Sequence, residues 1–249
     1  MRAVSETAER RRRSRELPPP LPPQTRTVGQ LVAETVRFYG RRFWASLALG
    51  VTPACLVVAE APFTQLERLV LLVTAGSILL TISYVAACVL VAGERRGSLK
   101  VAFAVGALVF APVPVLTTAF ILPGLAWLAL FGLAVPAALR EGRGFRASFR
   151  RGIALAKADY VHALGSLATL AIVVFLSQGV LYFLLRGAGE AAVAVAGFLA
   201  SLVISPLLFL GAALLYDDQA ARVRSSKADG ALPRRKPKAS GPVRHSSSR

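Results

Sequence analysis

Residues that carry out chemistry are scarce in this chain, and charged residues are nearly absent from long stretches of it. The 249 residues include only two cysteines and two histidines, and Cys55 and Cys88 form no CxxC pair. This excludes a histidine- or cysteine-rich metal site and predicts that both cysteines are small buried hydrophobic side chains. A glycine-rich phosphate-binding loop is also missing. We therefore expect no enzyme activity, and no catalytic, cofactor-binding or metal-binding residues.

What the chain does contain is a series of apolar, uncharged runs. They occupy residues 44–61, 69–93, 101–139, 161–185 and 191–216. A helix needs about 20 apolar residues to cross the hydrocarbon core of a bilayer, so the 39 residues of 101–139 are too many for one span. They predict two spans, 101–119 and 121–139, or a re-entrant hairpin. The expected fold is an all-α polytopic transmembrane bundle of about six spans.

The basic residues are distributed very unevenly between the connecting segments. In a six-span arrangement, 28 of the 30 Lys and Arg residues lie on one side, in 1–43, 94–100, 140–160 and 217–249. Only Arg68 and Arg186 lie on the other. Short loops rich in Lys and Arg stay in the cytoplasm, so both termini are predicted to be cytoplasmic. Arg outnumbers Lys by 25 to 5, which points to a GC-rich bacterial genome and hence to a bacterial plasma membrane.

Both ends of the chain have the composition of disordered segments. Residues 1–26 combine a basic block with five prolines, and 223–249 are rich in Ser, Lys and Arg. Such segments bury too little apolar surface to offset the entropy lost on ordering, so deleting either should leave the membrane domain, 27–222, folded. Their charge is better matched to anionic lipid headgroups nearby than to nucleic acid, which is not an expected partner.

Two amphipathic stretches, 27–43 and 142–158, precede spans one and five. Each places apolar residues at helical spacing on one face and cations on the other. In the second stretch the apolar residues include Phe145 and Phe149. Such a helix can lie in the membrane interface, although each stretch can also be the first turn of the next span. The interfacial alternative gives seven candidates for binding lipid headgroups: Arg37, Arg41, Arg42, Arg143, Arg146, Arg150 and Arg151.

Polar residues and prolines within the spans predict packing rather than chemistry. We expect Ser77, Thr81, Ser83 and Gln178 to form hydrogen bonds between helices. Asp217 and Asp218 follow the last span and are predicted to be solvated boundary charges. Six prolines should each remove a backbone hydrogen bond and bend or break a helix. They are Pro53, Pro112, Pro114, Pro123, Pro136 and Pro206.

Three segments resemble the glycerophosphodiester phosphodiesterase membrane-domain-like family, a group of bacterial integral membrane proteins. They are LVAETVRFYGRRFWASLALGVTPA (31–54), VPAALREGRGFRASFRRGIALAKADY (135–160) and SPLLFLGAALLYDD (205–218). The first is similar to the family's amphipathic start, the second to its Glu-Gly turn and Arg-Ser helix, and the third to its final span. The family's usual Arg soon after the final Asp is displaced here to Arg222 or Arg224. Some members are joined to a phosphodiesterase domain, which this sequence does not contain, so the resemblance implies a membrane domain and not that activity.

Two classes of function fit these features. The first is a non-enzymatic multi-pass membrane protein that organises or senses lipid, or anchors a membrane-protein partner at the inner leaflet. The alternative is a permease-like component that moves a lipid-like or weakly polar solute. A polar cavity lined by Gln178, Ser77 or Thr81 would favour the permease.

Overall fold

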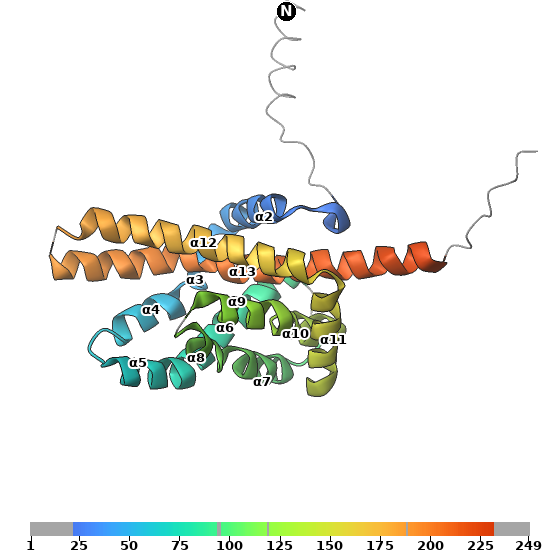
Figure 1. The fold of residues 1–249 in the computed structure, drawn as a ribbon, viewed down its shortest axis with the longest axis horizontal. Coiled ribbons are helices and arrows are strands. Elements are labelled where there is room, and N and C mark those ends of the chain that lie inside the picture. Colours follow the sequence, from blue (N-terminus) through green and yellow to red (C-terminus); the bar gives the residue numbers. More distant parts are fainter. Residues whose placement is uncertain (1–21, 94–95, 119, 188, 232–249) are drawn as a thin grey trace, which may run out of the picture.

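The computed structural model describes residues 22–93, 96–118, 120–187 and 189–231, which form helices and turns and include no strand. The elements in chain order are η1 (Pro23–Thr25), α2 (Val28–Arg41), α3 (Phe43–Ala48), α4 (Val51–Ala59), α5 (Gln65–Leu71), the π-helical turn η2 (Leu72–Gly76), α6 (Ser77–Ala92), α7 (Leu99–Phe110), α8 (Val113–Thr117), α9 (Ile121–Phe131), α10 (Ala134–Glu141), α11 (Phe145–Ala158), α12 (Tyr160–Leu185) and α13 (Glu190–Ala231) (Figure 1).

In the described part of the chain, five helices are long and apolar enough to cross a membrane. They are Gln65–Ala92, Leu99–Thr117, Ile121–Glu141, Tyr160–Leu185 and Ala191–Ser226. The predicted first span, 44–61, forms the shorter pair α3–α4, which reaches the necessary length only together with α2. The predicted all-α polytopic bundle is therefore confirmed.

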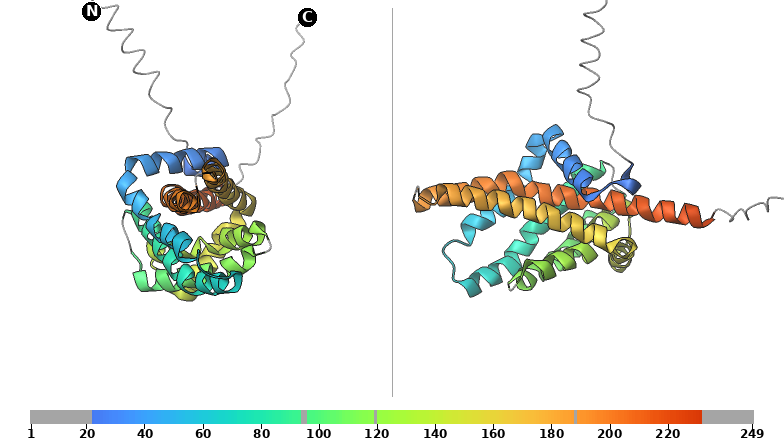
Figure 2. Two further views of the ribbon diagram at one scale, coloured as in Figure 1. Left: turned by 90° about the vertical axis from the view of Figure 1, so that its left-hand side faces the viewer. Right: turned by 45° about the horizontal axis from the view of Figure 1, so that its top comes forward.

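The long hairpin α12–α13 runs through the bundle. Seen end-on in Figure 2, it lies between α2–α3 on one side and the remaining helices on the other. Both clusters of buried hydrophobic residues include α13, with Leu210 and Leu215 fully buried in one each. This helix therefore joins the two parts of the core.

The last helix continues well past the predicted end of the membrane domain at 222. It reaches Ala231, the last residue that the structure describes. Ala220 and Ala221 are buried against the bundle, so tertiary packing supports its continuation past Asp218. The rest of the predicted tails, 1–21 and 232–249, lies outside the described residues.

The N-terminal amphipathic stretch forms a helix of its own, α2, rather than the first turn of a span. It meets α3–α4 at an angle of 105°. Thr27 and Gln30 form a capping box at its start. Leu31, Thr35 and Tyr39, spaced one helical turn apart, form its buried face, and the helix contacts both α12 and α13.

Proline breaks leave carbonyl groups that other helices satisfy. Pro53 has no N–H, so the Leu49 carbonyl at the α3–α4 junction loses its usual i+4 donor. The Ser83 hydroxyl of α6 donates to that carbonyl oxygen at 2.8 Å, and it also contacts the Thr52 hydroxyl. Ser83 thus forms the interhelical hydrogen bond that the sequence predicted for it, at a site where hydrocarbon offers no replacement donor.

The break between α9 and α10 is built in the same way. Pro136 leaves the Gly132 carbonyl without its i+4 donor, and the buried hydroxyl of Tyr84 in α6 donates to that oxygen at 3.1 Å. The Val135 N–H lies 3.4 Å from the same oxygen, which is a long hydrogen bond. Tyr84 is therefore the better-placed donor for a carbonyl group inside the bundle.

Pro206 leaves the Leu202 carbonyl of α13 without its i+4 donor. At this carbonyl the backbone of Gly50 approaches closely. A Cβ atom added to Gly50 would lie 1.9 Å from that carbonyl oxygen. Only glycine therefore fits between α3 and α4 where the first span crosses α13.

The hairpin formed by α7–α8 and α9–α10 is short. Its two arms have 19 and 21 residues, compared with 26 in α12. Its turn is apolar, since Phe120, Ile121 and Leu122 are exposed by half or more of their surface. In Figure 1 this turn lies nearer the middle of the α12–α13 hairpin than its tip. Each arm is long enough to cross the membrane, as the two-span prediction requires. The apolar turn, in contrast, is a feature expected of a re-entrant hairpin.

Candidate functional site

Many charged side chains gather at one end of the bundle, which we call the basic end. It comprises residues 96–100, α11 with the turn before it, and the part of α13 after Tyr216. The backbone N–H groups of Arg96 and Gly97 donate to the Leu139 carbonyl oxygen at 3.1 and 2.9 Å, which joins the loop before α7 to the end of α10. Figure 1 shows α11 lying across this end.

The four candidate arginines of α11 and its preceding turn divide into two pairs. Arg143 and Arg151 both form ion pairs with Glu141, the second at 2.8 Å. Arg146 and Arg150 are exposed and form no ion pair with any described residue. Of the four candidate arginines, the structure therefore leaves Arg146 and Arg150 open to an external anion.

The three candidates near the end of α2 are arranged differently. Arg37 and Arg41 each bind Glu34 at 3.0 Å. The Arg42 guanidinium lies 5.9 Å from the centre of the Phe38 ring. Because Glu34 already supplies the opposite charge, Arg37 and Arg41 are weaker candidates for binding lipid headgroups than the sequence indicated.

The inner face of α11 is fixed to the bundle. Ser148, Gly152, Leu155 and Ala156 are buried, and α11 contacts α10, α9, α7 and α13. A Cβ atom added to Gly152 would lie 2.6 Å from the backbone nitrogen of Ala134, so the two helices touch through backbone. The helix thus presents its arginines from a rigid support.

An aromatic row connects α11 to an open apolar groove. The Phe145 and Phe149 rings are 5.3 Å apart, and Phe149 lies 6.3 Å from Phe131 of α9, so Phe149 packs partly on protein rather than wholly on lipid. The groove has a volume of about 590 Å³. It is lined by Leu108, Ala111, Pro112, Trp127, Phe131 and Phe149. The groove is therefore apolar and open outward.

The structure contradicts the prediction that Asp218 is a solvated boundary charge. Its side chain is fully buried and forms a 2.7 Å ion pair with Arg26, whose side chain is 10% exposed. Arg26 belongs to the segment 1–26, which was predicted to stand apart from the bundle, yet η1 and Arg26 pack against α13. A buried carboxylate needs a cation close by, and this arginine supplies it.

Arg222 extends this buried pair into a network. Its guanidinium binds the Asp159 carboxylate at 2.6 Å and donates to the Arg26 carbonyl oxygen at 2.7 Å. The Gln219 amide donates to the Asp159 carbonyl oxygen at 3.1 Å. The segment before α2, the α11–α12 junction and the end of α13 are therefore held together by polar contacts.

A second group of contacts links α10 and α13. The Tyr216 hydroxyl donates to Glu141 at 2.7 Å, and Arg140 forms an ion pair with Asp217. The Arg140 guanidinium also lies 5.3 Å from the centre of the Tyr216 ring. Each carboxylate of the two groups is held by an arginine, so the arrangement stabilises the basic end.

The spacing of apolar residues along α13 is a sequence signal that Asp218 faces the core. Asp218 follows Leu214 by four residues and Leu215 by three, and both leucines are buried. Residues at these spacings share a helix face, so Asp218 continues the buried stripe. No comparable sequence signal identifies Arg26 as its partner, because the two are 192 positions apart.

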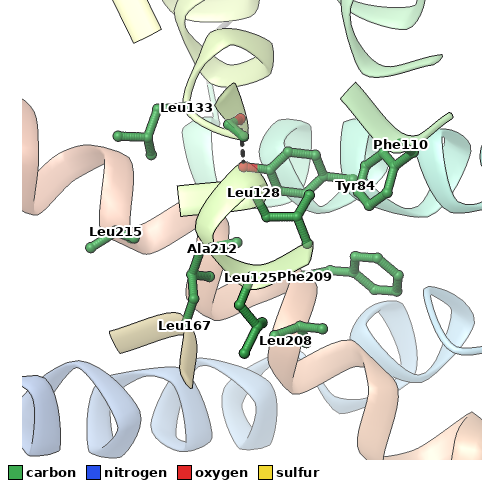
Figure 3. A pocket seen from close by; sticks show the side chains of 11 residues that line it. Tyr84, Phe110, Leu125, Leu128, Leu133, Leu167, Leu208, Phe209, Ala212 and Leu215 are labelled. Atoms are coloured by element: carbon green, nitrogen blue, oxygen red, sulfur yellow. Dashed lines mark hydrogen bonds between the residues drawn. The ribbon is translucent and has the colours of Figure 1, made fainter. Parts of the chain in front are cut away.

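The cavity between α6, α9, α12 and α13 is a packing void rather than a ligand site. Figure 3 shows leucine, phenylalanine and alanine side chains around it, and the Tyr84 hydroxyl donates to the Gly132 carbonyl oxygen. Its volume is about 40 Å³, which is too small for a drug-sized ligand.

The other polar residues predicted to link helices behave in different ways. The hydroxyls of Ser77 and Thr81 donate to carbonyl groups of their own helix, so the interhelical prediction is wrong for both. Gln178 lines a cavity of about 170 Å³ between α4, α12 and α13, with Tyr182 beside it. Cys88 is buried as predicted, whereas Cys55 is exposed.

Comparison of the chain with protein-family models, curated proteins and solved structures gives no match. Among the residues that the structure describes, no three His, Cys, Asp or Glu side chains converge as metal ligands. The site is therefore defined by its own geometry. A rigid helix carries two arginines that pair with no acidic side chain in the described ranges, and it lies beside an apolar groove.

Proposed function

We propose that this chain is a non-enzymatic, multi-pass membrane protein that binds anionic lipid headgroups through α11, and so organises lipid or anchors a partner at the inner leaflet. One observation carries the proposal. Arg146 and Arg150 are exposed and unpaired among the described residues, on a helix whose opposite face is fixed to the bundle. Each cation close to an anionic membrane surface contributes about 1 kcal/mol, and the attraction weakens with salt.

The proposal includes an orientation and a location. The basic end would face the cytoplasm of a bacterium, with both termini inside, because 28 of the 30 Lys and Arg residues lie on that side of a six-span chain. The resemblance to the glycerophosphodiester phosphodiesterase membrane-domain-like family supports the same location. The network at the basic end supports a structural use of the acidic residues rather than catalysis.

We expect the double variant Arg146→Gln and Arg150→Gln to retain less anionic lipid after purification. The loss should be at least about twofold at low salt and smaller at high salt, because exposed charges are screened. The measurement is mass spectrometry of co-purified phosphatidylglycerol relative to phosphatidylethanolamine.

The matched control is Arg37→Gln with Arg41→Gln, which removes the same charge from cations already bound to Glu34. Its effect on anionic lipid should be smaller. Equal retention by the α11 variant and the native chain, with unchanged topology, would reject α11 as the lipid-binding helix.

Cysteine labelling of intact cells tests the orientation. In a cysteine-free background, a cysteine at Thr64 should react from outside, and cysteines at Ser98 and Gly144 should be protected. Labelling of position 144 from outside would overturn the six-span arrangement. Position 118 reports on the α7–α10 hairpin, since outside labelling indicates two full spans and protection indicates a re-entrant hairpin.

The cavity at Gln178 favours a permease-like component as the second candidate. Its polar groups are an amide and, from Tyr182, a phenol, set against α13 residues with small side chains. A cysteine at position 178 in the same labelling series distinguishes the two functions. Reaction with a water-soluble reagent from either face would support a solute path, and protection from both faces would exclude one.

A further inference from the structure

A second and larger apolar groove lies on the other side of α7. Its volume is about 930 Å³, near the upper end of the roughly 300–1,000 Å³ typical of small-molecule sites. It is lined by Ala45, Ala48, Leu49, Ile82, Val85, Ala86, Val89, Leu90, Leu99, Lys100 and Phe103. Lys100 is the one charged residue in this lining.

The groove exists because the first span leaves α6 at this level. α4 contacts α6 directly, whereas α3 turns away toward α2 and α13. The small side chains of Ala45, Ala48 and Ala86 cannot fill the space, while Ile82 and Phe103 remain 46% and 37% exposed beside it. The result is an apolar surface of three helices that is closed on the protein side and open outward.

Positive charge gathers where the groove reaches the basic end. Lys100 and Arg96 are exposed and form no ion pair with any described residue. Ser98, the residue before α7, makes no capping hydrogen bond through its side chain, so it leaves the first N–H groups of this twelve-residue helix uncapped by its hydroxyl. Lys100 and the N-terminus of α7 therefore stand at the edge of an apolar groove. This combination suits a phosphate group attached to hydrocarbon chains.

We propose that this groove binds one glycerophospholipid with an anionic headgroup. Its acyl chains lie on α3, α6 and α7, and its phosphate lies between Lys100 and the start of α7. The site shares no residue with the Arg146 and Arg150 surface, and it differs in kind, because a groove of fixed size takes one molecule whereas exposed arginines attract many. It shares the proposed function's lipid chemistry and can fail independently of it.

Native mass spectrometry of the full-length protein, titrated with phosphatidylglycerol or phosphatidylcholine, tests the proposal. We expect a discrete one-to-one adduct with phosphatidylglycerol that phosphatidylcholine does not match. Lys100→Gln should lower its occupancy about fivefold, as expected for one lost cation near the phosphate, and Lys100→Arg should keep it.

A second test fills the groove with a larger side chain. Ile82→Trp should displace the lipid, whereas Ile78→Trp should not, because both isoleucines are 46% exposed on α6 but only Ile82 lines the groove. A native chain without a one-to-one adduct, equal loss in both tryptophan variants, or equal binding of the two lipids would each overturn the proposal. The variant Arg146→Gln with Arg150→Gln should keep the adduct, so the two lipid surfaces are judged separately.

Discussion

Arg26→Ala should destabilise the protein by about 3 kcal/mol, because it leaves the fully buried Asp218 carboxylate without its ion-pair partner. Asp218 Oδ2 already has no hydrogen-bond partner in the described part of the chain. For a chain of this size the melting temperature in detergent should fall by roughly 6–12 °C. The measurement is thermal unfolding followed by circular dichroism.

A double variant separates the charge pair from the general fit of the side chains. Arg26→Met combined with Asp218→Leu removes both charges while keeping apolar volume, and it should recover most of the lost stability. If the double variant were as unstable as Arg26→Ala, the cost would come from packing rather than from an unpaired buried charge. Asp218→Asn alone should be destabilising, since it leaves Arg26 buried without its anion.

Two N-terminal deletions test where the membrane domain begins. Deletion of 1–21 should change thermal stability little, whereas deletion of 1–26 should cost about as much as Arg26→Ala. The reason is that η1 and Arg26 contact α13, and the Arg26 carbonyl oxygen accepts a hydrogen bond from Arg222. Equal stability of the two truncated chains would restore the original expectation that all of 1–26 stands apart from the bundle.

Tyr84→Phe should destabilise the bundle by about 1–2 kcal/mol, because it removes the hydroxyl that donates to the Gly132 carbonyl oxygen. The substitution keeps the ring, so its contact with Phe110 at 5.7 Å is retained. The loss should appear as a lower melting temperature in detergent with unchanged helix content. Hydrocarbon supplies no replacement donor for the carbonyl group.

Pro136→Ala tests whether the Tyr84 hydroxyl stabilises the bundle by satisfying the Gly132 carbonyl. Alanine restores an N–H group four residues after Gly132, so the carbonyl regains a donor from its own helix. In that background Tyr84→Phe should cost less than half as much as in the native chain. An equal cost in both backgrounds would show that the Tyr84 hydroxyl stabilises the bundle in some way other than by satisfying this carbonyl.

Much of the architecture could be predicted because hydrocarbon allows few solutions. A run of apolar residues long enough to cross it must become a helix, so five of the predicted spans coincide closely with observed helices. The first span differs, because α3–α4 is short and diverges from α2 by 105°. The end of α13 differs too, because Gln219, Ala220 and Ala221 continue a helix that tertiary contacts support.

The candidate site could be predicted only in part. Composition and helical spacing identified the arginines of α11, but they could not separate Arg146 and Arg150 from Arg143 and Arg151. That distinction depends on Glu141, which lies ahead of the helix and is reached only after the chain turns at Gly142, a glycine with a left-handed backbone.

The sequence by itself determined most of the helices, the breaks at Pro53, Pro112 and Pro136, and the segments in which cations accumulate. These follow from local rules: the length of an apolar run, the missing N–H of proline and the distribution of Lys and Arg. Tertiary structure alone decided the partners. Tyr84 meets Gly132 across 48 positions and Arg26 meets Asp218 across 192, because a freed carbonyl or a buried charge must be satisfied by whichever donor the packing brings near, and packing is a property of the whole bundle.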